Sequence, residues 1–190
     1  KRFIVHKSRK EEFINAIKLE LKTMSVGNPN NASNDFGPLA KTENVKILNL
    51  QLKDALDKGA NMEFQMAVPD VKTFFPPTII NNINPSMKVY NEETFGPLFT
   101  IITFTKIEDA VDIANDTQYG LGSSIWTKDV NKAERLAKNI NAGSVFINEM
   151  TYSDPKLPFG GINLSGFGRE LSSYGLKEFV NIKTVFLGDK

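Results

Sequence analysis

The sequence predicts an α/β fold with a doubly wound, mostly parallel sheet. Leu98–Phe104 (LFTIITF) is an almost unbroken apolar run, as expected of a strand that is covered on both faces. From there to Ile147, segments with strand composition alternate with segments of helical periodicity, a pattern typical of right-handed crossovers between parallel strands. The composition, 190 residues with 41% hydrophobic and 24% charged residues, is that of an ordinary globular protein with a sizeable core.

A strand and two helices are expected before Leu98. Arg2–His6 has strand character at the very start, and no Met precedes it, so we expect the chain to be the later part of a longer polypeptide. Helices are predicted at Lys10–Met24 and Lys41–Asp57, the second with Gly59 as a suitable C-cap. Apolar side chains of the first form one helical stripe, namely Phe13, Ile14, Ile17, Leu21 and Met24.

The elements after Leu98–Phe104 follow at regular spacing. A capping box at Thr105–Glu108 begins a helix, and strands are predicted at Leu121–Trp126 and Ser144–Ile147 with a helix from Val130 between them. A long loop then begins at Asn148, where ligands bind in open α/β sheets. The last expected strand, Asn181–Gly188, has two faces that could be covered and therefore needs a partner.

Charge and residue usage exclude several kinds of site. The net charge of +1 provides no general field for nucleic acid or anionic membranes, and no apolar run is long enough to span a bilayer. With no cysteine and one histidine, the chain can assemble neither a zinc site, nor a thiol nucleophile, nor a serine triad. We expect no metal, no nucleic-acid partner, no membrane partner and a cytoplasmic location.

Two other chemical motifs fail on inspection. The glycine-rich run from Phe159 to Glu170 lacks the Gly-Lys-Ser/Thr ending of a phosphate loop. Ser165 lacks the first glycine of a nucleophile elbow and is expected in a turn or as a helix N-cap. His6 is expected to be a surface imidazole.

Glu92 and Glu93 precede the Thr94–Pro97 segment and the strand at Leu98. Adjacent side chains on extended backbone point to opposite sides, so the two carboxylates cannot act together on one substrate atom. One of them could accept hydrogen bonds from vicinal hydroxyl groups. The alternative is a solvated acidic pair before a Gly-Pro turn.

Seven motifs in chain order resemble the aldehyde dehydrogenase superfamily. They cover nearly the whole chain: FGPL, FFPPTII, MKVYNEETFGP, ANDTQYGLGSSIWTKD, AGSVFIN, PFGGINLSGFGRE and GLKEFVNIKTV. The similarity is greatest to the succinate-semialdehyde dehydrogenase branch. One departure is Asn163, where relatives commonly carry lysine.

The resemblance implies where the chemistry lies. Residues 1–172 would belong to the catalytic domain and residues 173–190 to an oligomerisation segment. The nucleophilic cysteine would fall a few positions before Lys1, and the general-base glutamate and the Rossmann domain for NAD or NADP further upstream. No catalytic residue is then expected in this chain, which should be inactive alone.

The resemblance also assigns binding residues. Glu93 would bind the ribose hydroxyls of the cofactor, Phe95 would pack near the nicotinamide, and Phe159 would line the aldehyde tunnel. Ser153 would bind the distal carboxylate of succinic semialdehyde, although it is equally suited to a Ser-Asp-Pro turn. The final strand, Asn181–Gly188, would join a neighbouring subunit in a homodimer or homotetramer. Alternatives are a dehydrogenase for a neutral or aromatic aldehyde and a non-catalytic oligomerisation module.

Overall fold

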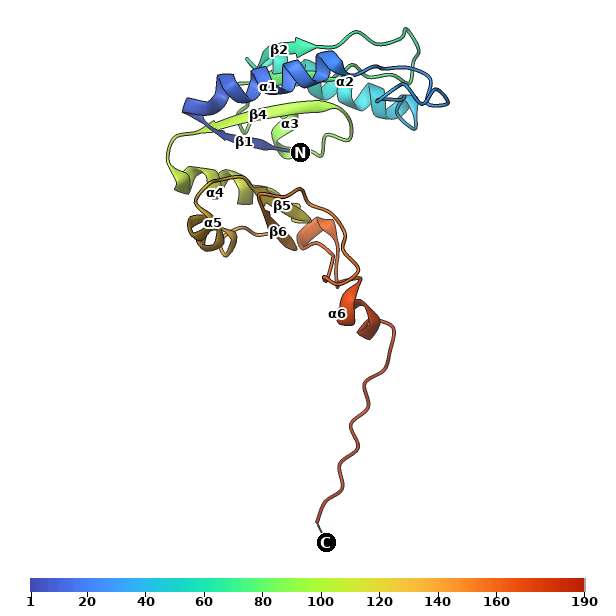
Figure 1. Cartoon of the computed structure of the whole chain (residues 1–190), viewed down its shortest axis with the longest axis vertical. Helices are drawn as coiled ribbons and strands as arrows, with labels where there is room; N and C mark the ends of the chain where they lie inside the picture. The colour runs from blue at the N-terminus through green and yellow to red at the C-terminus, as the bar shows by residue number, and fades with distance from the viewer. Residues whose placement is uncertain (190) are drawn as a thin grey trace. The chain divides into compact units, whose positions relative to one another are not determined.

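The computed structural model describes residues 1–189 and divides the chain into two compact units. Unit 1 is Lys1–Ile113 and unit 2 is Ala114–Lys190 (Figure 1). The expected functional boundary between residues 172 and 173 is not tested by this division and stays a prediction. No helix within residues 1–189 is both long and apolar enough to cross a membrane.

Unit 1 is built on a four-stranded sheet in the order β1-β4-β3-β2. Strand β4 lies between β1 and β3 and is parallel to both, with Phe3 opposite Ile101 and Thr78 opposite Leu98. Strand β2 is antiparallel to β3. The strands are β1 (Phe3–His6), β2 (Asn61–Gln65), β3 (Thr78–Asn81) and β4 (Leu98–Phe104).

Helices cover both faces of this sheet, which confirms the α/β prediction (Figure 1). Helix α1 (Lys10–Thr23) packs on one face with Ile79, whereas α2 (Thr42–Asp57) packs on the other with Ile80. The adjacent isoleucines point to opposite faces, as the two-residue period of a strand requires. The 3₁₀ helix η1 (Lys7–Arg9) precedes α1, and the short helix α3 (Lys88–Asn91) packs beside α2.

The strands expected in one continuous sheet from Leu98 to Ile147 lie in two sheets. In unit 2, β5 (Gly122–Ile125) and β6 (Ser144–Ile147) pair in parallel, with α5 (Val130–Ala137) between them in sequence. The prediction of a single sheet is wrong: β4 pairs with β1 and β3, whereas β5 and β6 pair with each other within the described chain. The remaining elements are α4 (Ile107–Asn115), which spans the division between units, η2 (Asn163–Ser165) and α6 (Ser172–Lys177).

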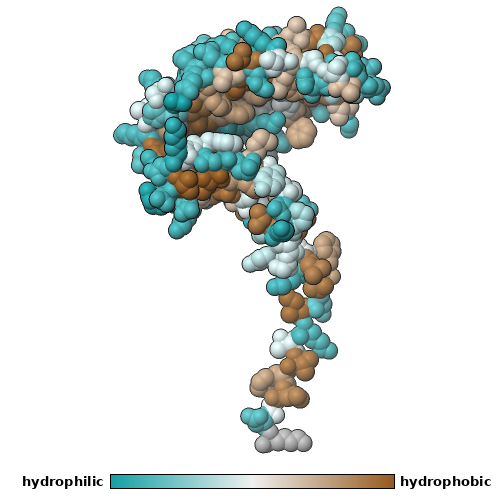
Figure 2. All heavy atoms as spheres, viewed as in Figure 1, coloured by the Kyte–Doolittle hydropathy of each residue, from teal (hydrophilic) through white to brown (hydrophobic). Residues whose placement is uncertain are grey.

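The segment predicted as a final strand, Asn181–Gly188, is neither helix nor strand. After α6 it runs away from β5 and β6, with apolar and polar side chains interspersed along it (Figures 1 and 2). Phe186 is 86% exposed and Ile182 is 77% exposed. The prediction is wrong for this chain by itself, because a strand needs a hydrogen-bonded neighbour and the described residues provide none.

Candidate functional site

The segment between α3 and β4 carries the first pair of candidate binding residues. Glu93 and Phe95 are exposed, Phe95 by 71%, whereas Thr94 between them is only 2% exposed. In extended backbone, alternate side chains share a side. The carboxylate and the phenyl ring therefore lie on the same, exposed side of the segment.

Helix α2 contacts this segment through a hydrogen-bonding side chain and through close packing. Gln51 Nε2 donates to the main-chain oxygen of Glu93 over 3.1 Å and to Glu92 Oε2 over 3.2 Å. At Gly96, a Cβ atom would collide with Leu48 Cδ1 of the same helix. The close packing explains why a glycine follows Phe95 and fixes the height of the segment above α2.

The backbone nitrogen of Lys1 lies on the inner side of the segment. It donates to Thr94 Oγ1 over 3.5 Å. On the exposed side, the carboxylate of Glu93 makes no hydrogen bond within the described residues.

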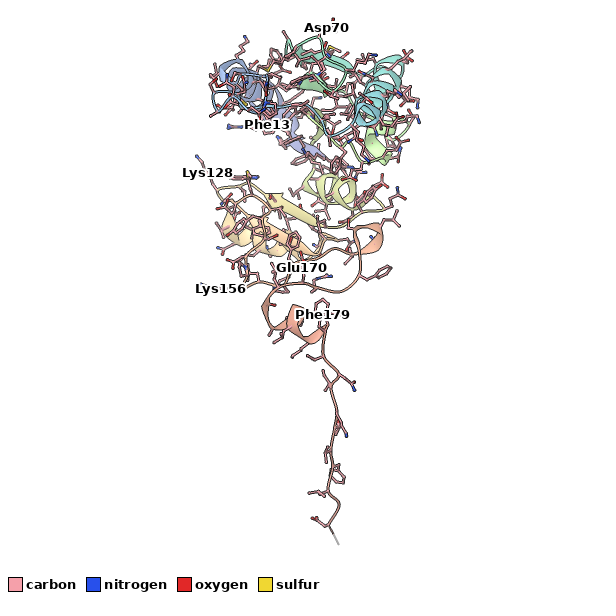
Figure 3. The ribbon with its side chains drawn as sticks, turned by 90° about the vertical axis from the view of Figure 1, so that its right-hand side faces the viewer. Phe13, Asp70, Lys128, Lys156, Glu170 and Phe179 are labelled. Atoms are coloured by element: carbon pink, nitrogen blue, oxygen red, sulfur yellow. The ribbon has the colours of Figure 1, made fainter. Side chains whose placement is uncertain are left out.

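Two hollows lie elsewhere in unit 1, and neither includes Glu93 or Phe95. One, of about 230 Å³, is mainly apolar and lies under Gly96 and Pro97, with Phe36, Phe75 and Phe99 in its wall. The other is an open depression at the start of α2, beside the loop that carries Asp70 (Figure 3). The candidate residues of unit 1 form an exposed ledge and not a cavity.

The long loop of unit 2 starts from a fixed point at Asn148. This residue has a left-handed backbone, with φ of 56°. Its Oδ1 accepts from the Thr127 amide over 2.8 Å, and its Nδ2 donates to the Thr127 carbonyl over 2.9 Å. The side chain thus imitates a strand neighbour and ties the loop to the end of β5.

Ser153, in this loop, is exposed and makes no hydrogen bond within the described chain. The turn that follows is made by Asp154, whose Oδ1 accepts from the Lys156 amide over 2.8 Å and whose carbonyl accepts from Leu157 over 3.0 Å. The alternative role of Ser153 as the turn-forming side chain is therefore not supported. Its hydroxyl is available to a ligand.

Phe159 is half-buried, and two main-chain hydrogen bonds with Glu170, of 2.9 and 2.7 Å, fix its backbone. The glycine-rich run between them folds onto itself, with Arg169 Nη1 donating to the carbonyl groups of Gly161 and Gly168. Two carbonyl groups of the run are thereby occupied by the Arg169 side chain. Lys156 and Glu170 mark the two limbs of the loop in Figure 3.

The two residues expected outside any site are placed as predicted. His6 is exposed and caps η1, its Nδ1 accepting from the Ser8 amide over 3.3 Å. Ser165 lies in η2, where its Oγ accepts from the Gly120 amide over 3.0 Å. The surface histidine and the turn serine are both confirmed.

Comparison with known protein families shows which family contains the residues described above. Residues 1–185 match the aldehyde dehydrogenase family. The chain belongs to this family. As an aldehyde dehydrogenase chain it also has the expected fold: it superposes on succinic semialdehyde dehydrogenase from Streptococcus pyogenes, solved with NADP⁺, with a TM-score of 0.94 and 35% identity, covering 100% of this chain and 42% of that one.

Two further relatives bear on the branch of the aldehyde dehydrogenases. The chain is 43% identical over 188 residues to the succinate-semialdehyde dehydrogenase [NADP(+)] of Mycobacterium leprae, covering 98% of this chain and 41% of that protein. It is 34% identical to betaine aldehyde dehydrogenase from Staphylococcus aureus, solved with NAD⁺, with a TM-score of 0.87 over 94% of this chain and 36% of that one. The chain thus spans about two-fifths of the length of such aldehyde dehydrogenases.

Sequence reasoning missed two side chains that hold the candidate binding residues of this aldehyde dehydrogenase chain. Gln51 interrupts the apolar stripe of α2 between Leu48 and Leu52, and a polar residue on a buried stripe is a signal that could have been found. Asn148 gave no such signal, because its role depends on a left-handed backbone that the sequence does not show.

Proposed function

We propose that this chain is part of an NAD(P)-dependent aldehyde dehydrogenase that oxidises succinic semialdehyde to succinate. The observation that carries the proposal is the 43% identity, over nearly the whole chain, to an enzyme named for that substrate. Within such an enzyme the chain would provide binding surfaces for the cofactor and the aldehyde.

The exposed ledge fits one end of a nicotinamide cofactor. Glu93 presents a carboxylate without a hydrogen-bond partner in the described chain, and two carboxylate oxygens suit the two vicinal hydroxyls of a ribose. Phe95, on the same side, offers an apolar ring face that is 71% exposed. When bound, the cofactor supplies the oxidant; Glu93 and Phe95 orient it.

The relatives do not all use the same cofactor, so similarity alone does not decide between NAD⁺ and NADP⁺ for this chain. One similar structure holds NADP⁺ and another holds NAD⁺. The ledge contacts only the nicotinamide end in this proposal, so we expect the selection to be made by residues outside this chain.

The nucleophile is also assigned outside the chain. Aldehyde oxidation through a covalent intermediate needs a thiolate, donors for the oxyanion and a base for water. The chain contains no cysteine. From the resemblance to the aldehyde dehydrogenase family we propose that the nucleophilic cysteine and the general-base glutamate belong to residues before Lys1, and we expect the chain to show no dehydrogenase activity by itself.

The loop of unit 2 provides the proposed substrate contacts. Ser153 has a free hydroxyl that can donate to the distal carboxylate of the substrate. Phe159, fixed through Glu170, provides an apolar wall that excludes water from the reacting carbon. The similarity to betaine aldehyde dehydrogenase favours a second candidate, an aldehyde whose distal group is not anionic.

Substitution of Ser153 distinguishes the two substrates. In the protein made of this chain and the residues that precede it, Ser153→Ala should raise the KM for succinic semialdehyde about tenfold, the loss expected for a hydrogen bond to a charged group. The KM for butanal should stay within about twofold of the starting value.

Ser173 offers a matched control, since it is an exposed serine of unit 2 in α6 and outside the loop. Ser173→Ala should change neither KM. Equal effects of Ser153→Ala on both aldehydes would refute the carboxylate-binding role and favour the second candidate.

A further inference from the structure

One buried side-chain oxygen within residues 1–189 has no hydrogen-bond partner: Oε1 of Gln51. The side chain is 2% exposed and points from α2 toward the segment that carries Glu93. An amide that is buried with only one end satisfied is unfavourable compared with an apolar side chain of the same size. Gln51 is therefore not explained by packing.

The orientation of the amide is fixed by its partners. Nε2 faces the carboxylate of Glu92 and the carbonyl of Glu93, and both are acceptors. Turning the amide over would place Oε1 against two oxygens. Nε2 of Gln51 must therefore face the segment, and Oε1 is left on the other side of the amide without a partner.

The hydrogen bond from Gln51 is the single one that the backbone of residues 93–95 makes in the described chain. The flanking anchors are at the ends of the segment: the Glu92 amide donates to Lys88, and the Pro97 carbonyl accepts from Thr78. Without Gln51, the main chain of residues 93–95 would make no hydrogen bond, and the segment would be held only through its ends, the buried Thr94 side chain and the packing of Gly96.

We propose that Gln51 is a positioning residue for cofactor binding, which acts by holding the main chain of Glu93 at a fixed height above α2. This inference rests on the proposed role of Glu93 toward the ribose. A carboxylate on a fixed backbone loses less freedom when a ligand binds, and so binds more tightly. In this proposal, the positioning of Glu93 explains why a buried amide with an unpaired oxygen occupies this site.

The test is Gln51→Leu in the protein made of this chain and the residues that precede it. Leucine has a similar volume and removes both the hydrogen bond and the orphan oxygen. We expect the KM for NAD(P)⁺ to rise about tenfold, while kcat and the KM for the aldehyde change by less than about twofold. The melting temperature should stay the same or rise, which a merely structural role would not give.

Gln65→Leu is the matched control. Gln65, in β2, also donates through Nε2 to a neighbour, Thr78 Oγ1 over 3.2 Å, but on a strand away from Glu93. It should leave the KM for the cofactor unchanged. Gln51→Met serves as the second replacement; if both Gln51 variants unfold, the amide is needed for folding and the proposal is overturned.

A double-mutant cycle separates this inference from the function on which it rests. If Gln51 acts through Glu93, then Gln51→Leu should have no further effect on the KM for the cofactor once Glu93→Ala is present. A large effect of Glu93→Ala with none of Gln51→Leu would overturn the positioning role and leave the proposed function standing. No effect of Glu93→Ala would overturn the cofactor role of Glu93 and the inference with it.

Discussion

Two glycines show how closely single residues pack in this chain. A Cβ on Gly143 would collide with the carbonyl of Gly160, so the AGS and FGG motifs are in backbone contact. Because the obstacle is backbone and not a flexible side chain, neither partner can give way. The contact joins the start of β6 to the loop that carries Phe159.

Gly143→Ala should therefore destabilise the protein by about 3 kcal/mol, the upper end of the usual range for overpacking, because the neighbour is rigid. Gly59→Ala provides the comparison, since its φ of 94° is strained for alanine but no atom lies within 4 Å of the added carbon. It should cost only about 1 kcal/mol. Urea unfolding of both variants measures the difference, and equal losses would contradict the contact.

Asp54 joins α2 to α3 and gives the fold a pH dependence. Its Oδ1 lies 2.7 Å from Lys58 Nζ, and its Oδ2 accepts from the Lys88 amide over 2.8 Å. The hydrogen bond from Lys58 and then that from Lys88 lower the pKa of the carboxyl below its usual 3.8. A carboxyl whose pKa is lowered by folding stabilises the folded state above its unfolded pKa and loses that effect as the pH falls through the folded value.

We therefore expect the stability to decline as the pH falls below about 4, and Asp54→Asn to flatten part of this decline. The measurement is the urea midpoint at a series of acidic pH values for both proteins. Parallel curves would show that the pair with Lys58 has no influence on stability.

At the scale of single residues, the sequence predicted which residues lie outside a functional site better than it predicted which hydrogen bonds each side chain makes. It placed His6 and Ser165 outside any site, as the structure does. It left open whether Ser153 binds a ligand or belongs to a Ser-Asp-Pro turn, because the residue types suit both, and only the geometry shows that Asp154 makes the turn.

At the scale of elements, periodicity identified long segments and missed short ones. The seven-residue β4 and the helices α1 and α2 lie where the pattern predicts them. Strand β3 was missed although all four of its residues are buried, because two prolines directly precede this short apolar run. The expected capping box is shifted by one residue: α4 begins at Ile107, with Asp109 Oδ2 accepting from the Lys106 amide.

The N-terminus of α5 depends on a single cap. Asp129 Oδ1 accepts from the Lys132 amide over 2.9 Å. Asp129→Ala should lower the stability by about 1 kcal/mol, whereas Asp129→Asn, which keeps an oxygen acceptor, should cost only a few tenths. Thermal unfolding of the two variants tests this, and an alanine variant as stable as the asparagine one would show that the cap contributes nothing.

At the scale of the whole molecule, the C-terminal segment calls for a partner. Phe179, Ile182, Val185, Phe186 and Leu187 are all exposed on a segment that follows α6 (Figures 2 and 3). Strand-forming residues without a neighbour are a template for pairing with another chain. We propose that a second copy supplies this neighbour in a homodimer or homotetramer, with Asn181–Gly188 as the added strand.

Charged substitutions on one face of the segment test this assembly. Ile182→Lys together with Phe186→Lys should convert the oligomer to monomer in analytical ultracentrifugation, because a buried lysine on each copy would be left unpaired. Lys183→Ser, on the other face, is the control. A starting protein that sediments only as a monomer would refute the proposed assembly.

The sequence predicted the whole-molecule class through motifs, but not how the strands divide into sheets. That division depends on which strand edges find each other in space, as β4 does with β1 and β3. Likewise, the sequence could show that Asn181–Gly188 suits a strand but not what it pairs with, because the neighbour is not in the described chain.

The most direct test of the central claim is NAD(P)H formation by the protein made of this chain and the residues that precede it. Succinic semialdehyde and butanal are compared at equal concentration, with both NAD⁺ and NADP⁺. The account predicts a kcat/KM at least about tenfold higher for the acid, as expected if a hydrogen bond to a charged carboxylate contributes to its binding. Equal values for the two aldehydes, or turnover of butanal alone, would contradict it.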